Sequence, residues 1–195
     1  MKLRRLCVFC GSNAGASPDY VAAGRALGRM LAGQGIGVVY GAGGIGVMAA
    51  VADGALEAGG EVVGVIPRHL WTLEVGHRAL TELHVVESMH ERKNLMAELA
   101  DGFVALPGGI GTLEEFFEVW TWGQLKLHHK PVGLLNVGGY FDRLLDFLGQ
   151  MVAERFLHNG HHAMMLVDAD PARLVERMAA YQAPEVERWF DRART

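Results

Sequence analysis

The residues best suited to chemistry in this sequence lie in one short stretch, Pro107-Gly-Gly-Ile-Gly-Thr-Leu-Glu-Glu115. Its glycines, Gly108, Gly109 and Gly111, permit positive φ angles and let a ligand approach the backbone, so that several N–H groups can point at one anion. Thr112 is expected to open a helix, and its hydroxyl and the positive end of the helix dipole favour a phosphate at the same place. The stretch therefore predicts a phosphate-binding loop.

Glu115 has two interpretations. It lies three residues after Thr112, so its carboxylate can accept a hydrogen bond from the Thr112 N–H and form a helix-capping box. However, Glu114 and Glu115 place two carboxylates beside a loop that would hold phosphate. Sugar hydroxyls or a developing positive charge in the ligand would give Glu115 a function. Spacing alone leaves both interpretations open.

A basic pair, Arg92 and Lys93, follows a second capping box made by Ser88 and Glu91. Both cations then fall about one turn into the helix predicted over 88–100. Positive charge near a helix start opposes the helix dipole, and a purely structural helix would avoid it. The alternative is an ordinary charged helix face.

These segments together resemble the LOG (Lonely Guy) family, the cytokinin riboside 5'-monophosphate phosphoribohydrolases. The pattern Pro107-Gly-Gly-x-Gly-Thr-x-x-Glu115 is specific by itself, and three other segments are also similar to the family: Met89-His-Glu-Arg-Lys93, Thr121-Trp-Gly-Gln-Leu125 and Lys130-Pro-Val-Gly-Leu-Leu-Asn136. The resemblance runs from Cys7 to about residue 157 and so covers nearly the whole chain.

The resemblance implies hydrolysis of the N-glycosidic bond in a purine nucleoside 5'-monophosphate, a cytokinin precursor or AMP, with release of the base and ribose 5-phosphate. Arg92 and Glu115 are the implied catalytic residues. Ionised Glu115 would hold ribose hydroxyls or the attacking water near an oxocarbenium-like transition state. Arg92, which stays charged, would orient the nucleotide and stabilise the leaving base. The expected substrate contacts are Ser12, Gly43, Gly44, Glu74, Met89, Lys93, Gly108, Gly109, Ile110, Gly111, Thr112, Leu113, Glu114 and Thr121. For Ser12, the interpretation as an ordinary turn residue stays equally open.

The resemblance also implies a homodimer with the site near the interface, and we expect no cofactor. Two alternatives remain. Members of the family have been labelled lysine decarboxylases, an activity that would require a pyridoxal phosphate lysine, and Lys93, Lys126 and Lys130 lack convincing surroundings for one. The other alternative is a non-catalytic module of the same fold that binds or senses a nucleotide.

The elements that must position these residues follow from hydrophobic periodicity. Apolar runs predict strands at 6–9, 35–40, 61–66, 82–87, 102–106, 132–136 and 164–167, and amphipathic segments predict helices at 20–32, 47–58, 88–100, 112–127, 141–156 and from 171 onward. This alternation predicts an α/β protein with a modified Rossmann fold, a doubly wound, mostly parallel sheet with helices on both faces. The carboxyl ends of its strands would bring the glycine loops, Ser12, Glu74 and Arg92 to one crevice.

A second glycine-rich loop, Gly41-Ala-Gly-Gly-Ile-Gly46, follows the second predicted strand. Its Gly-x-Gly-x-x-Gly spacing matches the dinucleotide fingerprint. That interpretation is weakened because the next strand runs into Pro67 and Arg68 instead of ending in an acidic residue. Two such loops favour a mononucleotide held between them. The following segment, 67–79, is expected to be an irregular functional loop or lid, with Glu74 either a substrate contact or a solvated carboxylate.

Composition limits the function classes. The chain has 195 residues, of which 50% are hydrophobic and 21% charged, and this favours one nucleotide-binding domain over 1–195. A net charge of -4 argues against nucleic-acid binding. We expect a cytoplasmic protein, because no apolar run suits a membrane span and the N-terminus enters a strand.

Two further groups of residues suggest chemistry that their surroundings do not support. Cys7 and Cys10 are expected on opposite faces of a buried strand, where no disulfide can close between them. His158, His161 and His162 lack further ligands for a metal.

Overall fold

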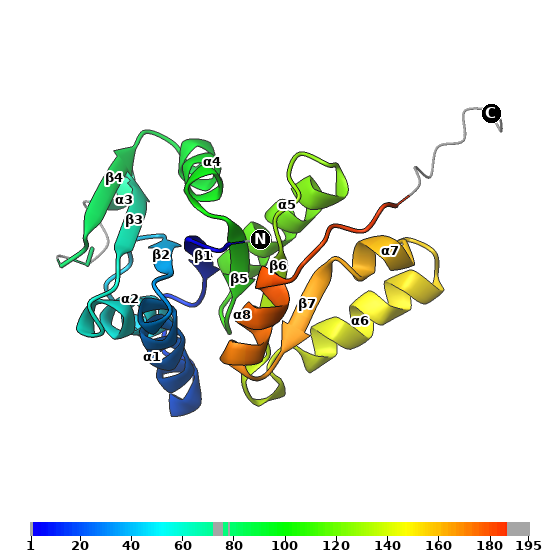
Figure 1. Cartoon of the computed structure of the whole chain (residues 1–195), viewed down its shortest axis with the longest axis horizontal. Coiled ribbons are helices and arrows are strands. Elements are labelled where there is room, and N and C mark those ends of the chain that lie inside the picture. Colours follow the sequence, from blue (N-terminus) through cyan, green and yellow to red (C-terminus); the bar gives the residue numbers. More distant parts are fainter. Residues whose placement is uncertain (1, 72–75, 78, 187–195) are drawn as a thin grey trace.

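The computed structural model describes residues 2–71, 76–77 and 79–186, and the strands in this part of the chain form one parallel sheet. They are β1 (Arg5–Phe9), β2 (Gly37–Tyr40), β3 (Val62–Pro67), β4 (Glu82–Val86), β5 (Gly102–Ala105), β6 (Val132–Leu135) and β7 (Met165–Asp168). Their order across the sheet is β4-β3-β2-β1-β5-β6-β7, and every neighbouring pair is parallel. The order proceeds outward on both sides of the central pair β1 and β5 (Figure 1).

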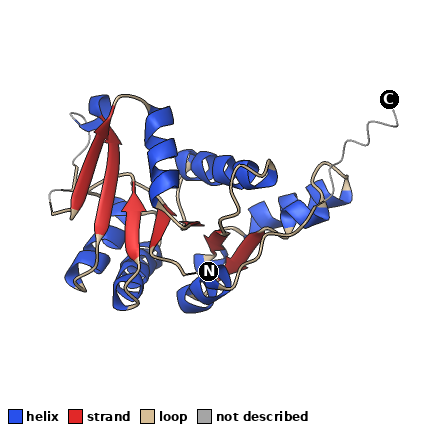
Figure 2. Ribbon diagram, turned by 45° about the horizontal axis from the view of Figure 1, so that its top comes forward, coloured by secondary structure: helices blue, strands red, loops and turns tan. Residues whose placement is uncertain are grey.

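Helices cover both faces of the sheet (Figure 2). They are α1 (Pro18–Gly33), α2 (Gly46–Glu57), α3 (Arg68–Trp71), α4 (Met89–Leu99), α5 (Ile110–Gln124), the 3₁₀ turn η1 (Val137–Gly139), α6 (Asp142–Ala153), α7 (Asn159–His162) and α8 (Pro171–Ala179). One hydrophobic cluster packs α1, α2 and α8 against the first face, and a second cluster packs α4, α5 and α6 against the other. The predicted doubly wound sheet is therefore confirmed.

Alternation along β1 shows why the sheet has two apolar faces. Leu6 and Val8 belong to the first cluster, whereas Cys7 and Phe9 belong to the second. Successive side chains of a strand point to opposite faces, so Cys10 returns to the first cluster. Both thiols are buried and free, as the sequence predicts.

Several helix boundaries differ from those predicted. Helix α5 begins at Ile110, with Gly109 as its N-cap, and not at Thr112. Within the segment expected to be irregular, residues 68–71 form the single turn α3. The short elements η1 and α7 were not predicted, because one-turn elements carry too few residues to show a period.

The sheet has its topological switch point between β1 and β5. Here the chain leaves neighbouring strands toward opposite faces, so the loops that follow them separate and leave a crevice. Ligands of such sheets bind at this point. None of the helices in the described ranges combines the length and apolar character needed to span a lipid bilayer.

Candidate active site

A cavity of about 380 Å³ lies at the carboxyl end of β1, beside the switch point. Its walls come from the end of β1 and the residues that follow it, the loop after β2 with the start of α2, one side of α4, and the first two turns of α5. Among the predicted site residues, those that line it are Ser12, Met89, Arg92, Gly109, Ile110, Gly111, Thr112, Glu114 and Glu115. The structure therefore brings residues from three separate segments to one cavity.

Other predicted contacts do not line this cavity. They are Gly43, Gly44, Lys93, Gly108, Leu113 and Thr121. Gly108 lines an adjoining hollow of about 250 Å³ that shares Gly11, Ser12 and Gly109 with the cavity. Thr121 lies on the exposed surface of α5, where its hydroxyl donates a hydrogen bond to the Phe117 carbonyl over 2.7 Å. Glu74 lies outside the described residues.

Arg92 is almost completely buried, with 8% of its surface exposed. Its guanidinium is held by backbone carbonyls: Nε donates to Val65 O over 3.1 Å, and Nη2 donates to Gly41 O over 3.0 Å. No carboxylate of the described residues lies within ion-pairing distance of it. A buried cation held by neutral dipoles keeps its charge available for a ligand.

Glu115 faces the same cavity from the second turn of α5. Burial raises the pKa of its carboxyl to about 7; Arg92 and Lys93 act in the opposite direction, and Glu114 and Glu118 reinforce the rise. A carboxylate whose pKa lies near neutrality can exchange protons with a reacting group under physiological conditions. Arg92 and Glu115 thus place a permanent cation and a titrating carboxylate at one cavity.

Lys93 does not line the cavity and is neutralised by two carboxylates. Its ammonium lies 2.6 Å from Glu114 Oε1 and 2.9 Å from Glu118 Oε2, and its side chain is 11% exposed. Burial lowers the pKa of Lys93, but the hydrogen bonds that its ammonium donates to Glu114 and Glu118, together with their negative charges, outweigh burial and leave the pKa raised. This ion pair links α4 to α5 and thereby holds the helices that carry Arg92 and Glu115.

The capping-box interpretation of Thr112 and Glu115 is wrong. The N-cap is Gly109, whose carbonyl accepts from Leu113 N over 3.2 Å. Thr112 therefore lies in the first turn, where it is 4% exposed, and Glu115 lies a turn further on. At the start of α4 only half of the predicted box is formed: Ser88 Oγ accepts from Glu91 N over 3.1 Å, but the Glu91 carboxylate accepts from Glu87 N over 2.8 Å and not from Ser88 N.

The expectation of positive φ in the loop after β5 is also wrong, because none of its glycines has that conformation. Gly108 is instead required by close packing: a Cβ there would lie 2.1 Å from Thr112 Oγ1 and 2.7 Å from Gly11 N. The loop is further fixed by Tyr140, whose hydroxyl donates to Gly108 O over 2.6 Å. Tyr140 was not predicted, because it follows η1 and its role depends on contact between distant segments.

Gly41 is a second residue whose role the sequence did not reveal. A Cβ at this position would lie 1.8 Å from Nη2 of Arg92, so only glycine leaves room for the guanidinium. The glycine-rich pattern indicated the loop, but it did not show that the Arg92 side chain fills the space beside Gly41. Met48 and Met96, which also line the cavity, carry no chemical signal in the sequence.

The described residues do not form a metal site, since no group of three or more His, Cys, Asp or Glu side chains there is placed to hold an ion. They also do not fit a pyridoxal phosphate Schiff base at this cavity. None of the lysines in the described ranges lines it, and Lys93 is engaged by Glu114 and Glu118. A Schiff-base lysine must be able to lose its proton, whereas the pKa of Lys93 is raised, despite burial, by these two hydrogen bonds.

Comparisons with known proteins identify relatives of the chain. The family model described as "Possible lysine decarboxylase" matches residues 48–178. The chain is 46% identical over 180 residues to the probable cytokinin riboside 5'-monophosphate phosphoribohydrolase LOGL9 of Oryza sativa subsp. japonica, covering 92% of this chain and 79% of that protein. It is 45% identical over 168 residues to the cytokinin riboside 5'-monophosphate phosphoribohydrolase of Rhodococcoides fascians, covering 86% of this chain and 85% of that protein.

Solved structures share the fold. The molybdenum cofactor carrier protein of Chlamydomonas reinhardtii superimposes with a TM-score of 0.69 at 25% identity, over 92% of this chain and all of that one. The molybdenum cofactor binding protein of Rippkaea orientalis gives a TM-score of 0.68 at 23% identity, over 92% and 98% of the two chains. At the latter identity the likeness shows the fold alone.

Proposed function

The chain belongs to the LOG family of cytokinin riboside 5'-monophosphate phosphoribohydrolases, and from this membership we propose that it hydrolyses the N-glycosidic bond of such nucleotides. The products are the free cytokinin base and ribose 5-phosphate. One observation carries the proposal: Arg92 and Glu115 line the same cavity. Arg92 is buried and forms no ion pair with a carboxylate of the described residues, and the pKa of Glu115 is raised to about 7.

The N-terminus of α5 is suited to the 5'-phosphate. Within the described part of the chain, the backbone N–H groups of Ile110, Gly111 and Thr112 donate to no acceptor. Free N–H groups and the positive end of a helix dipole favour a dianion at this point. Ser12, three residues after the end of β1, lines the same cavity and can add its hydroxyl.

The bond to be broken joins C1' of the ribose to a ring nitrogen of the base. Water adds to C1' as the bonding electrons leave with the base, which then takes a proton from solvent. Positive charge develops on the ribose during this step, and the Glu115 carboxylate can stabilise that charge, hold ribose hydroxyls or accept a proton from the attacking water. The ionised form of Glu115 is the active one.

Arg92 acts at the other end of the bond. Its guanidinium remains protonated, so it orients the nucleotide and stabilises negative charge on the leaving base without donating a proton. The two carbonyls that hold it, Val65 O and Gly41 O, restrict its orientation before the substrate binds. Such preorganisation favours the transition state, because no reorganisation is needed during the reaction.

AMP is a second proposed substrate, since it carries the same ribose 5-phosphate and the same glycosidic bond as the cytokinin nucleotides.

We also propose a homodimer. Leu125 and Leu127 at the end of α5 are 63% and 70% exposed, and apolar surface of this kind favours association. Analytical ultracentrifugation measures the assembly directly.

The direct test is chromatographic detection of free base after incubation with AMP and with isopentenyladenosine 5'-monophosphate. Wild-type protein should release base from both, and the ratio of the two rates gives the preference. Arg92→Ala and Glu115→Gln should each reduce release by about a hundredfold or more, because each removes a transition-state contact.

Calorimetry with the same nucleotides separates the proposal from its alternative. If both nucleotides bind and neither loses its base, the chain is a nucleotide-binding module of the same fold. Near-normal turnover by Glu115→Gln would instead overturn the role given to Glu115.

A further inference from the structure

The backbone of residues 76–77 lies against the glycine-rich loop after β2. Gly76 forms an antiparallel bridge with Gly43, and His77 N donates to Ala42 O over 3.1 Å. The contact joins a segment ahead of β4 to the loop that lines the cavity through Gly41.

Ala42 needs such support because its backbone has an unfavourable conformation. Its φ is +60°, a left-handed value that residues with a Cβ rarely adopt, and it is completely buried. Residues held in this region keep it only where their surroundings enforce it. The carbonyl immediately before Ala42 is Gly41 O, which accepts the hydrogen bond from Arg92 Nη2. The conformation at Ala42 thus sets the direction of a carbonyl that orients Arg92.

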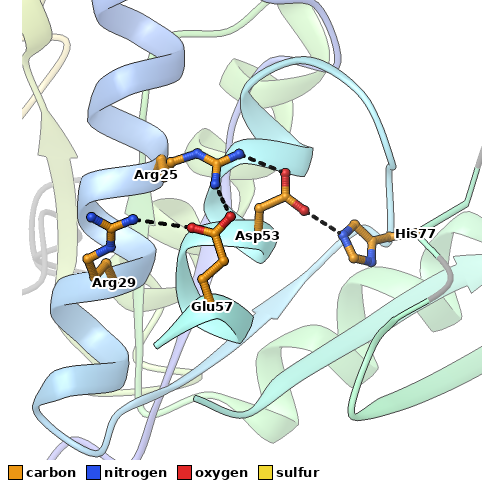
Figure 3. A network of polar contacts seen from close by, with 5 residues as sticks. All are labelled: Arg25, Arg29, Asp53, Glu57 and His77. Carbon is orange, nitrogen blue, oxygen red and sulfur yellow. Dashed lines mark hydrogen bonds and ion pairs between the residues drawn. The ribbon is translucent and has the colours of Figure 1, made fainter. Parts of the chain in front are cut away.

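The side chain of His77 is fixed at both ring nitrogens. Nδ1 accepts from Ala79 N over 3.3 Å, so Nε2 carries the proton and donates to Asp53 Oδ1 over 3.0 Å. Only 12% of the side chain is exposed. Figure 3 shows His77 and Arg25 on opposite sides of the Asp53 carboxylate.

Asp53 is itself held in place by neighbouring helices. Its Oδ2 lies 3.1 Å from Arg25 Nη2, and Arg25 also pairs with Glu57. Glu57 lies 3.2 Å from Arg29 on the outer side of this network (Figure 3). His77 is therefore attached to the packed pair α1 and α2, which cannot move without disturbing the core.

We propose that His77 is a positioning residue of the active site. By its hydrogen bond to Asp53 it fixes residues 76–77 against Ala42, and so keeps the Gly41 carbonyl directed at the guanidinium of Arg92. The inference rests on the proposed function, because Arg92 is the group that His77 serves. His77 touches neither substrate nor reacting atoms.

The test compares His77→Ala with His77→Gln in base release from AMP. His77→Ala should lower kcat about tenfold and change KM less than about threefold, because small misplacement of a catalytic group mainly raises the barrier. Glutamine can still donate to Asp53, so His77→Gln should return kcat to within about threefold of wild type. Arg29→Ala is the matched control: it breaks the outer pair of the same network and should leave kcat unchanged.

A readout that does not depend on turnover is the NMR signal of the Arg92 Nε–H, assigned by its loss in Arg92→Lys. In wild type and His77→Gln this proton should be slow to exchange, and in His77→Ala it should exchange at least about tenfold faster, since its hydrogen bond to Val65 O weakens when Arg92 is released.

The outcomes separate two failures. If His77→Ala keeps wild-type kcat and wild-type exchange of the Arg92 Nε–H, the positioning role is wrong. Equal loss of kcat in His77→Ala and His77→Gln, with slow exchange retained in both, also overturns it. If wild type releases no base, the proposed function has failed, and the exchange measurement still decides whether His77 holds Arg92.

Discussion

The glycine-rich loops after β2 and β5 both lead into a helix at the carboxyl edge of the sheet. The two helix starts differ in whether their backbone N–H groups have acceptors within the protein. In α2, Val47 N and Met48 N both donate to Gly11 O, over 3.1 and 3.2 Å. In α5, Ile110 N and Gly111 N have no acceptor within the described residues. At the start of the first helix the protein supplies an acceptor for Val47 N and Met48 N, whereas the start of the second helix faces the cavity.

The glycines of the two loops differ in the same way. After β2, a Cβ at Gly41 would meet Arg92, one at Gly43 would lie 2.9 Å from Met48 Sδ, and Gly46 has φ +66°. After β5, a Cβ at Gly109 or Gly111 would meet no atom within 4 Å, and neither has positive φ.

The difference shows that glycine spacing alone does not identify a ligand loop. Gly41, Gly43 and Gly46 are explained by contacts and conformation within the protein. Gly109 is the N-cap of α5, a position that suits glycine, but Gly111 has no such explanation, and glycine within a helix is less favourable than alanine. Gly111 also lines the cavity, so its open position leaves room for a ligand to approach the backbone closely.

The largest expected effect that tests this comparison is that of Gly41→Ala. The new Cβ would lie 1.8 Å from Arg92 Nη2, so the guanidinium must move. We expect kcat for base release to fall about a hundredfold, because misplacing a catalytic group by about 1 Å has effects of this size. Steady-state kinetics with AMP measure it. Gly33→Ala, where a Cβ would meet nothing within 4 Å, is the control. Normal turnover in Gly41→Ala would show that the loop does not position Arg92.

A smaller effect concerns pH and the helix after β5. The ionised fraction of Glu115 increases with pH, and burial raises its pKa to about 7. Base release should therefore rise with pH, about tenfold per pH unit below 7, and level off above it. A pH–rate profile of kcat/KM measures this.

The same shift has an opposite effect on stability. The folded state binds the Glu115 proton more tightly than the unfolded state, whose pKa is near 4.5, so folding stability is lost as pH rises from 4.5 to about 7. Over this interval the urea midpoint of wild type should fall relative to that of Glu115→Gln. If instead kcat/KM of wild type does not rise with pH below 7, a group other than Glu115 limits the reaction.

The smallest effect is that of Gly111→Ala. Alanine removes chain entropy from the unfolded state and meets no atom of this protein, so the free energy of unfolding should rise by about 0.5 kcal/mol. If phosphate approaches here, KM for AMP should increase about fivefold, since the methyl group enters its space. Urea denaturation and steady-state kinetics give the two quantities. An unchanged KM would show that phosphate does not approach Gly111, and the loop after β5 would then not be distinguished from the loop after β2 as a ligand loop.

Much of the architecture could be predicted from local sequence. Alternation of apolar runs and amphipathic segments gave the strands, the main helices and the two-sided sheet, because the periods of strand and helix are properties of neighbouring residues. The motif ending in Glu115 and the basic pair at Arg92 also identified the family and the two residues to which we assign catalysis. One-turn elements and the start of α5 were missed or misplaced, because single residues decide them.

Other features were decided only by the tertiary structure. Arg92 is held by carbonyls 27 and 51 residues away in the chain, and His77 meets Asp53 across 24 residues. The pKa of Glu115 depends on how completely α4 and α5 exclude water from it. Residue types and spacing could therefore indicate the chemistry. The orientation of Arg92, the burial of Glu115 and the free N–H groups at the start of α5 arise from packing between segments that are distant in the chain. A local sequence pattern contains no information on such packing.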